Sequence, residues 1–157
     1  MLSLQEISDR LEIQDLAWLY SEIIDAKDFD RLRDDVFTPD AYIDYSAMGG
    51  SKGDLESTIA FLHKAMKIFP AHQHLNSNHR IKFGEGEVPQ TATGRVMCFN
   101  PQQFEPRDGE DEGHIFFCGL WYVDEYVRTD AGWRIKNRVE EKSYFFNAPD
   151  FMPTAAK

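Results

Sequence analysis

Cysteine, basic charge and long apolar runs are all scarce in this chain of 157 residues. Its two cysteines, Cys98 and Cys118, lack the spacing of metal ligands, and one pair is a weak signal for a disulfide. No stretch approaches the roughly 20 apolar residues of a membrane-spanning helix, and the N-terminus has no signal-peptide pattern. We therefore expect a cytoplasmic protein in which both thiols are reduced.

The shortage of positive charge limits the possible partners. Lysine and arginine total 17 against 27 acidic residues, which gives a net charge of -10. An acidic surface repels phosphate backbones and anionic lipid headgroups, so we expect neither nucleic acid nor a membrane as a partner. Glycine-rich phosphate loops of the G-x-G-x-x-G and Walker types do not occur. We expect no cofactor and no covalent serine nucleophile.

Helical periodicity dominates the first half of the chain and strand patterns dominate the second half, which is typical of an α+β domain. Ser3 and Glu6 have the spacing of a capping box, so they predict the start of a first helix. A short second helix is expected from about residue 28, and a third over residues 54–67. The apolar face of the first helix is predicted to comprise Leu4, Ile7, Leu11, Ile13, Leu16, Tyr20 and Ile23.

The strands are expected at residues 41–45, 72–83, 91–99, 114–127 and 133–144, with an acidic loop over residues 101–112. We expect one domain over residues 1–147 and a loose tail over residues 148–157. Residues 114–127 are apolar on both faces, so helices, a ligand or another subunit must cover the second face. We hypothesise a homo-oligomer, either a dimer or a trimer.

Asp25 is the acidic residue with the clearest chemical potential. It ends an apolar helix, where an aspartate often caps the next helix, but Asp28 can also serve as that cap. A carboxylate that faces a histidine fixes the imidazole tautomer and stabilises its protonated form. Two histidines, His72 and His74, share one face of a predicted strand, and His79 follows. These three could alternatively be metal ligands, or simple hydrogen-bonded histidines.

Several other side chains could serve a pocket. Tyr20, Tyr45 and Tyr122 could donate hydrogen bonds to a ligand oxygen, or could be core residues. Arg138 could anchor an anion, or could be solvated at a sheet edge. Aromatic residues make up 13% of the chain, which fits either ordinary core packing or an apolar small-molecule pocket.

The order of these motifs resembles the SnoaL-like group of the nuclear-transport-factor-2-like superfamily, over about residues 7–144. Each motif is weak alone, but their order and spacing together are specific for the fold. The resemblance is carried by Ile13-Gln14-Asp15-Leu16, Tyr20, Asp25-Ala26-Lys27-Asp28-Phe29-Asp30-Arg31-Leu32, Asp44-Tyr45, His74, Ile81, Thr91-Ala92-Thr93-Gly94, Asp124-Glu125-Tyr126 and Gly132-Trp133.

This resemblance implies a cone-shaped α+β barrel with a curved, mostly antiparallel sheet wrapped around three N-terminal helices. Within the group, the likeness is to scytalone dehydratase, bile-acid dehydratase and hexachlorocyclohexane dehydrochlorinase, which eliminate water or HCl without a cofactor. Their catalytic aspartate and histidine correspond to Asp25 and His74, and active-site tyrosines correspond to Tyr20 and Tyr45. A second histidine of scytalone dehydratase is replaced by Phe117.

The implied function is a cofactor-independent lyase or isomerase that acts on a small apolar cyclic or polyketide-like molecule. An aspartate of bile-acid dehydratase falls near Asn100, so Asn100 and Arg138 are candidates for substrate binding. The expected pocket wall comprises Phe117, Leu120 and Trp121, and no metal site is expected. The alternative is a non-catalytic ligand-binding protein or accessory subunit of the same fold, because function varies widely within this superfamily.

Overall fold

The computed structural model describes residues 1–109 and 112–152, and its first half is mainly helical, as predicted. The helical elements are α1 (Leu4–Asp25), η1 (Phe29–Arg31), α2 (Leu32–Asp35), η2 (Ser46–Met48), α3 (Leu55–Ala65) and η3 (Met66–Ile68). The strands are β1 (Phe37–Asp44), β2 (Lys52–Asp54), β3 (Ala71–His72), β4 (Leu75–Phe83), β5 (Thr91–Gln103), β6 (Ile115–Thr129) and β7 (Gly132–Phe146).

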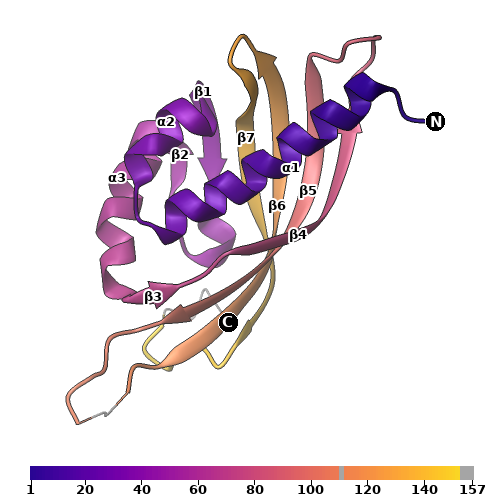
Figure 1. Ribbon diagram of the computed structural model, residues 1–157. Helices are drawn as coiled ribbons and strands as arrows, with labels where there is room; N and C mark the ends of the chain where they lie inside the picture. The colour runs from indigo at the N-terminus through magenta and orange to yellow at the C-terminus, as the bar shows by residue number, and fades with distance from the viewer. Residues whose placement is uncertain (110–111, 153–157) are drawn as a thin grey trace.

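One strongly curved sheet contains all the strands, and α1 lies across it (Figure 1). The strand order is β2-β1-β7-β6-β5-β3, and β4 also pairs with β5. All pairs are antiparallel except β1 with β7. Register shifts interrupt the β1–β7, β4–β5 and β6–β7 pairs, and such bulges bend a sheet. The expected cone-shaped α+β fold is therefore confirmed.

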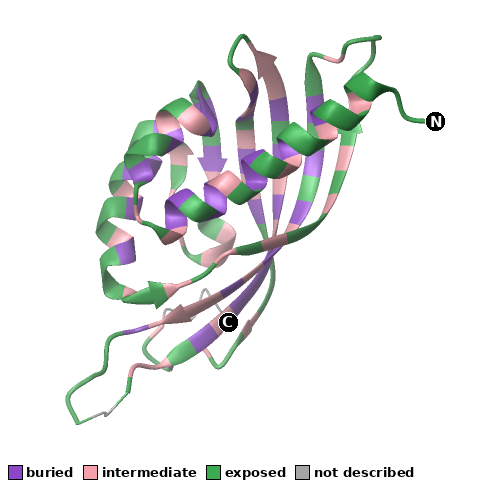
Figure 2. Cartoon of the chain, in the orientation of Figure 1, coloured by how far each residue is buried: buried purple, intermediate pink, exposed green. Residues whose placement is uncertain are grey.

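Helix α1 begins where the capping pattern predicts, because Ser3 Oγ accepts a hydrogen bond from Glu6 N at 3.1 Å. Its buried face differs from the prediction at the N-terminal end. Leu4 is 87% exposed and Leu11 is 59% exposed, whereas the carboxylate of Asp9 is buried. The N-terminal end of α1 extends away from the other helices (Figure 2), so no helix in the described part of the chain covers it. The apolar period alone therefore did not identify the face of α1 that packs.

Two strand boundaries differ from the prediction by four residues. Strand β1 begins four residues earlier than expected and includes Pro39, which falls at the register shift where no ladder hydrogen bond is required. Strand β5 continues to Gln103, so the first three residues of the expected acidic loop are in the sheet. Residues 110–111 of that loop lie outside the described residues.

The expected strand over residues 72–83 is divided into β3 and β4, with Gln73 and His74 between them. Gln73 N donates to Pro101 O at 3.1 Å, so this connection stays attached to β5. The backbone N–H of His74 does not join the ladder and instead donates to Asp25 at 3.0 Å. The break in the sheet edge therefore joins His74 to the end of α1.

Successive side chains of β6 lie on opposite faces of the sheet. Phe116, Leu120 and Tyr122 are buried on the concave face, under the helices. Phe117 stacks on Phe99 at 5.6 Å on the other face, where the guanidinium of Arg95 also covers the Trp121 ring at 3.8 Å. Part of this second apolar face is therefore covered by the chain's own side chains.

The segment after β7 packs back on the domain. The Phe151 ring meets the Phe104 ring edge-on at 5.0 Å, and Met152 N donates to Pro149 O at 3.0 Å. Residues 153–157 of the expected tail lie outside the described residues. Among the helices that are described, none combines the length and the apolar composition that crossing a bilayer requires.

Candidate functional site

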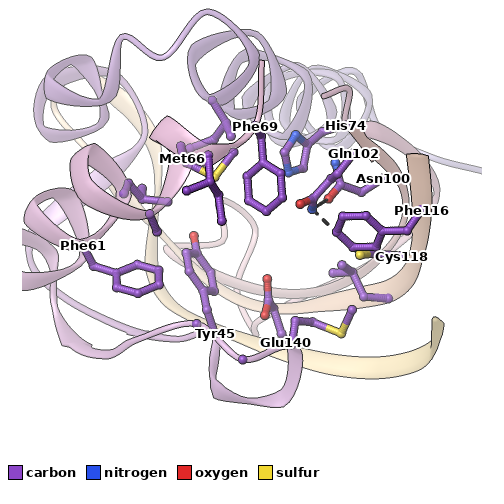
Figure 3. Close-up of a pocket in the computed structure, with 18 of the residues that line it drawn as sticks. Tyr45, Phe61, Met66, Phe69, His74, Asn100, Gln102, Phe116, Cys118 and Glu140 are labelled. Carbon is purple, nitrogen blue, oxygen red and sulfur yellow. Dashed lines mark hydrogen bonds between the residues drawn. The ribbon is translucent and has the colours of Figure 1, made fainter. Parts of the chain in front are cut away.

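A cavity of about 790 Å³ lies between the helices and the concave face of the sheet. Most of its wall is apolar, and a few polar side chains face into it (Figure 3). The apolar wall includes Ile24, Phe61, Leu62, Met66, Phe69, Phe104, Phe116, Leu120 and Phe145. The polar residues of the lining are Tyr20, Tyr45, Lys64, His74, Asn100, Gln102, Tyr122 and Glu140. This composition is typical of a small-molecule site.

Asp25 and His74 form a pair at one side of this cavity. Asp25 Oδ1 lies 2.7 Å from His74 Nδ1, and Asp25 Oδ2 accepts a hydrogen bond from His74 N at 3.0 Å. Asp25 is the last residue of α1, and Asp28 precedes η1 without forming a side-chain cap. The Asp25 carboxylate thus binds His74 with both of its oxygens.

The geometry of this pair determines the tautomer of His74. An ionised carboxylate only accepts hydrogen bonds, so His74 Nδ1 carries the proton and Nε2 keeps its lone pair in the neutral ring. Burial acts to raise the pKa of Asp25, but the hydrogen bonds and charge of His74 outweigh it, so this pKa lies below its ordinary value of 3.8. The carboxylate is therefore ionised at neutral pH and can stabilise an imidazolium.

The other two histidines of the metal alternative make their hydrogen bonds elsewhere. His72 Nε2 lies 3.1 Å from Ile24 O and 3.9 Å from Asp25 Oδ1, and burial lowers the pKa of His72. His79 Nε2 lies 3.1 Å from the Tyr126 hydroxyl, and burial lowers the pKa of His79 to about 4. The described residues contain no group of three acidic, histidine or cysteine side chains that could hold a metal ion. The three histidines therefore do not converge on one metal site.

Tyr20 and Tyr45 both line the cavity, and their hydroxyl oxygens are 2.8 Å apart. Burial raises the pKa of Tyr20 to about 12, and it raises the pKa of Tyr45 well above 10.0. Both hydroxyls are therefore neutral, and because one of their two protons lies between the oxygens, one hydroxyl keeps a proton that it can donate to a ligand. The Tyr20 ring meets the His74 ring edge-on at 6.5 Å, which places the tyrosine pair on the same side of the cavity as the histidine.

Arg138 lies beneath these tyrosines and does not line the cavity. Its Nε and Nη2 atoms bind the two carboxylate oxygens of Asp124 at 2.8 and 2.7 Å, and both side chains are fully buried. The guanidinium carbon is 4.2 Å from the centre of the Tyr20 ring and 4.3 Å from that of Tyr122. The alternative of a solvated arginine at a sheet edge is therefore wrong.

The remaining predicted residues divide into two groups. Asn100 and Leu120 line the cavity, whereas Phe117 and Trp121 lie on the opposite face of β6. Asn100 Nδ2 donates to Gln73 O at 2.6 Å, and its Oδ1 accepts from Gln102. Asn100 thereby holds the connection that carries His74. The error for Phe117 and Trp121 arose because β6 is apolar on both faces, so composition did not indicate which face is inside.

Sequence reasoning missed Glu140, which is buried at the cavity wall. Its position two residues after Arg138 on β7 was the available signal, because alternate residues of a strand share one face. Glutamate is rarely buried without a partner, so residue type alone does not predict Glu140 in a cavity wall.

Ser51 occupies the run Gly49-Gly50-Ser51-Lys52-Gly53, which has the G-x-S-x-G spacing of nucleophilic serines. In those enzymes the serine lies on a sharp turn from a strand into a helix. Here Ser51 precedes β2, and its buried hydroxyl has no hydrogen-bond partner among the described residues. The local geometry that activates such a serine is therefore not formed at Ser51.

Known proteins share both the sequence and the fold. The uncharacterised protein Rv2910c of Mycobacterium tuberculosis is 48% identical over 144 residues, which cover 92% of each chain. A candidate scytalone dehydratase from Novosphingobium aromaticivorans is 17% identical, with a TM-score of 0.77 over 92% of this chain and 91% of that one. The LinA-type3 hexachlorocyclohexane dehydrochlorinase from Novosphingobium barchaimii is 20% identical, with a TM-score of 0.72 over 91% and 92% of the two chains.

The two solved structures are under 25% identical, so they establish the fold. The SnoaL-like domain family matches residues 5–139, which include nearly all of α1, the Asp25–His74 pair and β5 and β6, and which end one residue before Glu140 on β7. With this match and the 48% identical relative, the chain belongs to the SnoaL-like domain family.

Proposed function

We propose that this protein is a cofactor-independent lyase or isomerase that uses His74 and Asp25 for general acid–base chemistry on a small apolar cyclic or polyketide-like molecule. The observation that carries this proposal is the 2.7 Å contact between His74 Nδ1 and Asp25 Oδ1 at the wall of a large apolar cavity. Similar proteins described as a dehydrochlorinase and as a candidate scytalone dehydratase support elimination as the reaction type.

In the proposed elimination, His74 Nε2 takes a proton from the carbon adjacent to the one that carries the leaving group. The electrons of the broken C–H bond form the new double bond, and the leaving group departs with its own electron pair. Asp25 holds the ring and stabilises the imidazolium as it forms. A positioned base of this kind contributes roughly 10²–10⁴-fold to a rate.

Tyr20 and Tyr45 have the complementary role in this proposal. One hydroxyl donates to the other, and the second hydroxyl donates to the oxygen that gains charge or departs. A donor placed where charge develops lowers the barrier. In an isomerisation, the same donor stabilises an enolate oxygen, and the imidazolium returns its proton to another carbon. The products differ in mass, because only elimination loses water or another small molecule.

The cavity determines the proposed substrate class. Its volume of about 790 Å³ falls within the range of about 300–1,000 Å³ that is typical of small-molecule sites. Phenylalanine, leucine, isoleucine, methionine and alanine residues form most of its wall, so an apolar ring system fits it better than a sugar or a nucleotide. Asn100 already has both ends of its amide engaged within the wall, which leaves His74, the tyrosines and Glu140 as the main polar contacts.

The test is a thermal-shift screen of wild-type and His74→Ala protein against cyclic ketones, hydroaromatic alcohols and steroid-like compounds, with mass analysis of each hit. We expect some compounds to stabilise both proteins and to be converted by the wild type alone. Hits that bind both proteins and are converted by neither would instead favour the non-catalytic ligand-binding alternative. Conversion by His74→Ala at the wild-type rate would contradict the proposed base.

A further inference from the structure

Glu140 stands apart from the groups that the proposed reaction uses. It lies on β7 directly opposite Tyr122 on β6, so it shares the concave face with the residues around the cavity. Its side chain lines the cavity, and its carboxyl group points into the hollow that His74 also borders (Figure 3). Only 9% of the residue is exposed, and its Oε2 atom has no hydrogen-bond partner among the described residues.

An unpaired, buried carboxyl group requires an explanation, because leaving a buried polar atom unsatisfied costs stability. Ionised, it would also require a compensating charge. Arg138 supplies positive charge nearby, but its Nε and Nη2 bind Asp124, and its Nη1 has no hydrogen-bond partner among the described residues, Glu140 included. Glu140 thus has a burial cost without the ion pair that would offset it.

Burial favours the neutral form of the Glu140 carboxyl group. Burial raises the pKa of Glu140 well above its ordinary value of 4.5, the charge of Arg138 acts against this rise, and the charge of Asp44 adds to it. The other titratable groups that interact with it are neutral at pH 7 because burial raises the pKa of each: Tyr20, Tyr45, Cys98, Cys118 and Tyr122.

We propose that Glu140 is a neutral carboxylic acid that donates a hydrogen bond to an acceptor oxygen of the ligand, at a point on the ligand separate from the carbon that His74 deprotonates. The position of His74 relative to the ligand in this inference rests on the proposed function. The substrate class is thereby narrowed to an apolar ring compound that carries a carbonyl or a similar acceptor oxygen, since a hydrocarbon would leave the acid unpaired.

A ligand with an ammonium group would be the other possible partner of Glu140. That ligand would need the ionised carboxylate, which burial disfavours, and would bring a second cation close to the buried guanidinium of Arg138. The opposite pH dependence separates the two cases. Binding through a neutral acid weakens when Glu140 loses its proton at high pH, whereas binding of a cation strengthens.

The first test measures the proton directly. The infrared difference spectrum between wild type and Glu140→Gln at pH 7 should contain the carbonyl band of one protonated carboxyl group in the wild type, and addition of α-tetralone, a bicyclic ketone, should shift that band. A wild-type spectrum without this band would overturn the proposal. Near-ultraviolet circular dichroism verifies that the near-isosteric glutamine variant is folded.

The second test measures whether Glu140 recognises the carbonyl oxygen of a ligand. Calorimetric titration compares α-tetralone with tetralin, the matching hydrocarbon, on wild type, Glu140→Gln and Glu140→Leu. We expect the wild type to prefer the ketone by about 5- to 10-fold, as one hydrogen bond allows. Glu140→Gln should keep this preference through its amide N–H, and Glu140→Leu should lose it. A wild type without a preference, or a leucine variant that retains it, would contradict the proposal.

Failure of this inference and failure of the proposed function give different results. Ketone preference is an equilibrium property, so it persists in His74→Ala if Glu140 donates as proposed, even if no compound is ever converted. In the converse case, turnover depends on His74 while Glu140→Leu keeps the ketone preference of the wild type. That result would support the role of the Asp25–His74 pair and contradict the role of Glu140.

Discussion

The side chain of Asp25 contacts His74 twice, at the ring Nδ1 over 2.7 Å and at the backbone N–H over 3.0 Å. The two residues are 49 positions apart, and they meet because the sheet edge is interrupted between β3 and β4. One carboxylate therefore fixes both the position of the backbone and the tautomer of the ring. Such support by a second residue is what a positioned base requires.

Replacing the carboxylate of Asp25 should impair catalysis more than folding. Asp25→Asn keeps the shape of the side chain but loses the charge that stabilises the imidazolium, so turnover of a screened substrate should fall by roughly 10²–10⁴-fold. Steady-state kinetics measure this fall. Asp28→Asn is the matched control, because Asp28 is exposed and does not form a side-chain cap, and its turnover should equal that of the wild type.

Acid should weaken the contribution of Asp25 to stability. The pKa of Asp25 is lower in the folded protein than its ordinary value of 3.8, so the unfolded chain binds the proton more readily. The stabilisation is complete above the ordinary value and is lost as the pH falls through the folded-state pKa. Urea unfolding of wild type and Asp25→Asn over this range should show two free energies that converge on acidification. A constant difference would contradict the assigned shift.

Breaking the buried pair of Arg138 and Asp124 should be strongly destabilising. Arg138→Leu leaves the fully buried Asp124 carboxylate without its partner, which costs about 3–5 kcal/mol. The double variant Arg138→Leu with Asp124→Leu should recover much of that loss, because neither charge remains. Urea unfolding measures each variant. Lys136→Leu on the same strand breaks only the exposed contact with Asp40 and should change stability by less than about 1 kcal/mol.

The homo-oligomer expected from the apolar second face of β6 remains a prediction. Phe117 on that face packs against Phe146, which is 63% exposed and lies at the end of β7. We expect a dimer or trimer in sedimentation velocity at micromolar concentration, and Phe146→Glu should shift it toward the monomer because a charge opposes burial. A wild-type monomer at that concentration would rule out this interface.

Local sequence patterns were sufficient to predict most of the helices and strands. The Ser3–Glu6 spacing located the start of α1, and the long strands were found within a few residues of their boundaries. The errors share a cause, since each depended on a partner distant in the chain. Leu4 and Leu11 follow the apolar period of α1 but are exposed, because Asp9 is the side chain that packs against Trp133 and Arg128 of the sheet. Pro39 is accepted in β1 because the register shifts there.

By itself, the sequence determined the α+β class, the resemblance to its family and the candidate pair Asp25 and His74, because periodicity, turns and motif order are local properties. Only the tertiary structure decided that this pair is in contact, that Phe117 and Trp121 face away from the cavity, and that Glu140 faces into it. A strand that is apolar on both sides has the same pattern whichever face is inside. The curvature of the sheet, which bulges and long-range pairing produce, determines which face becomes the cavity wall.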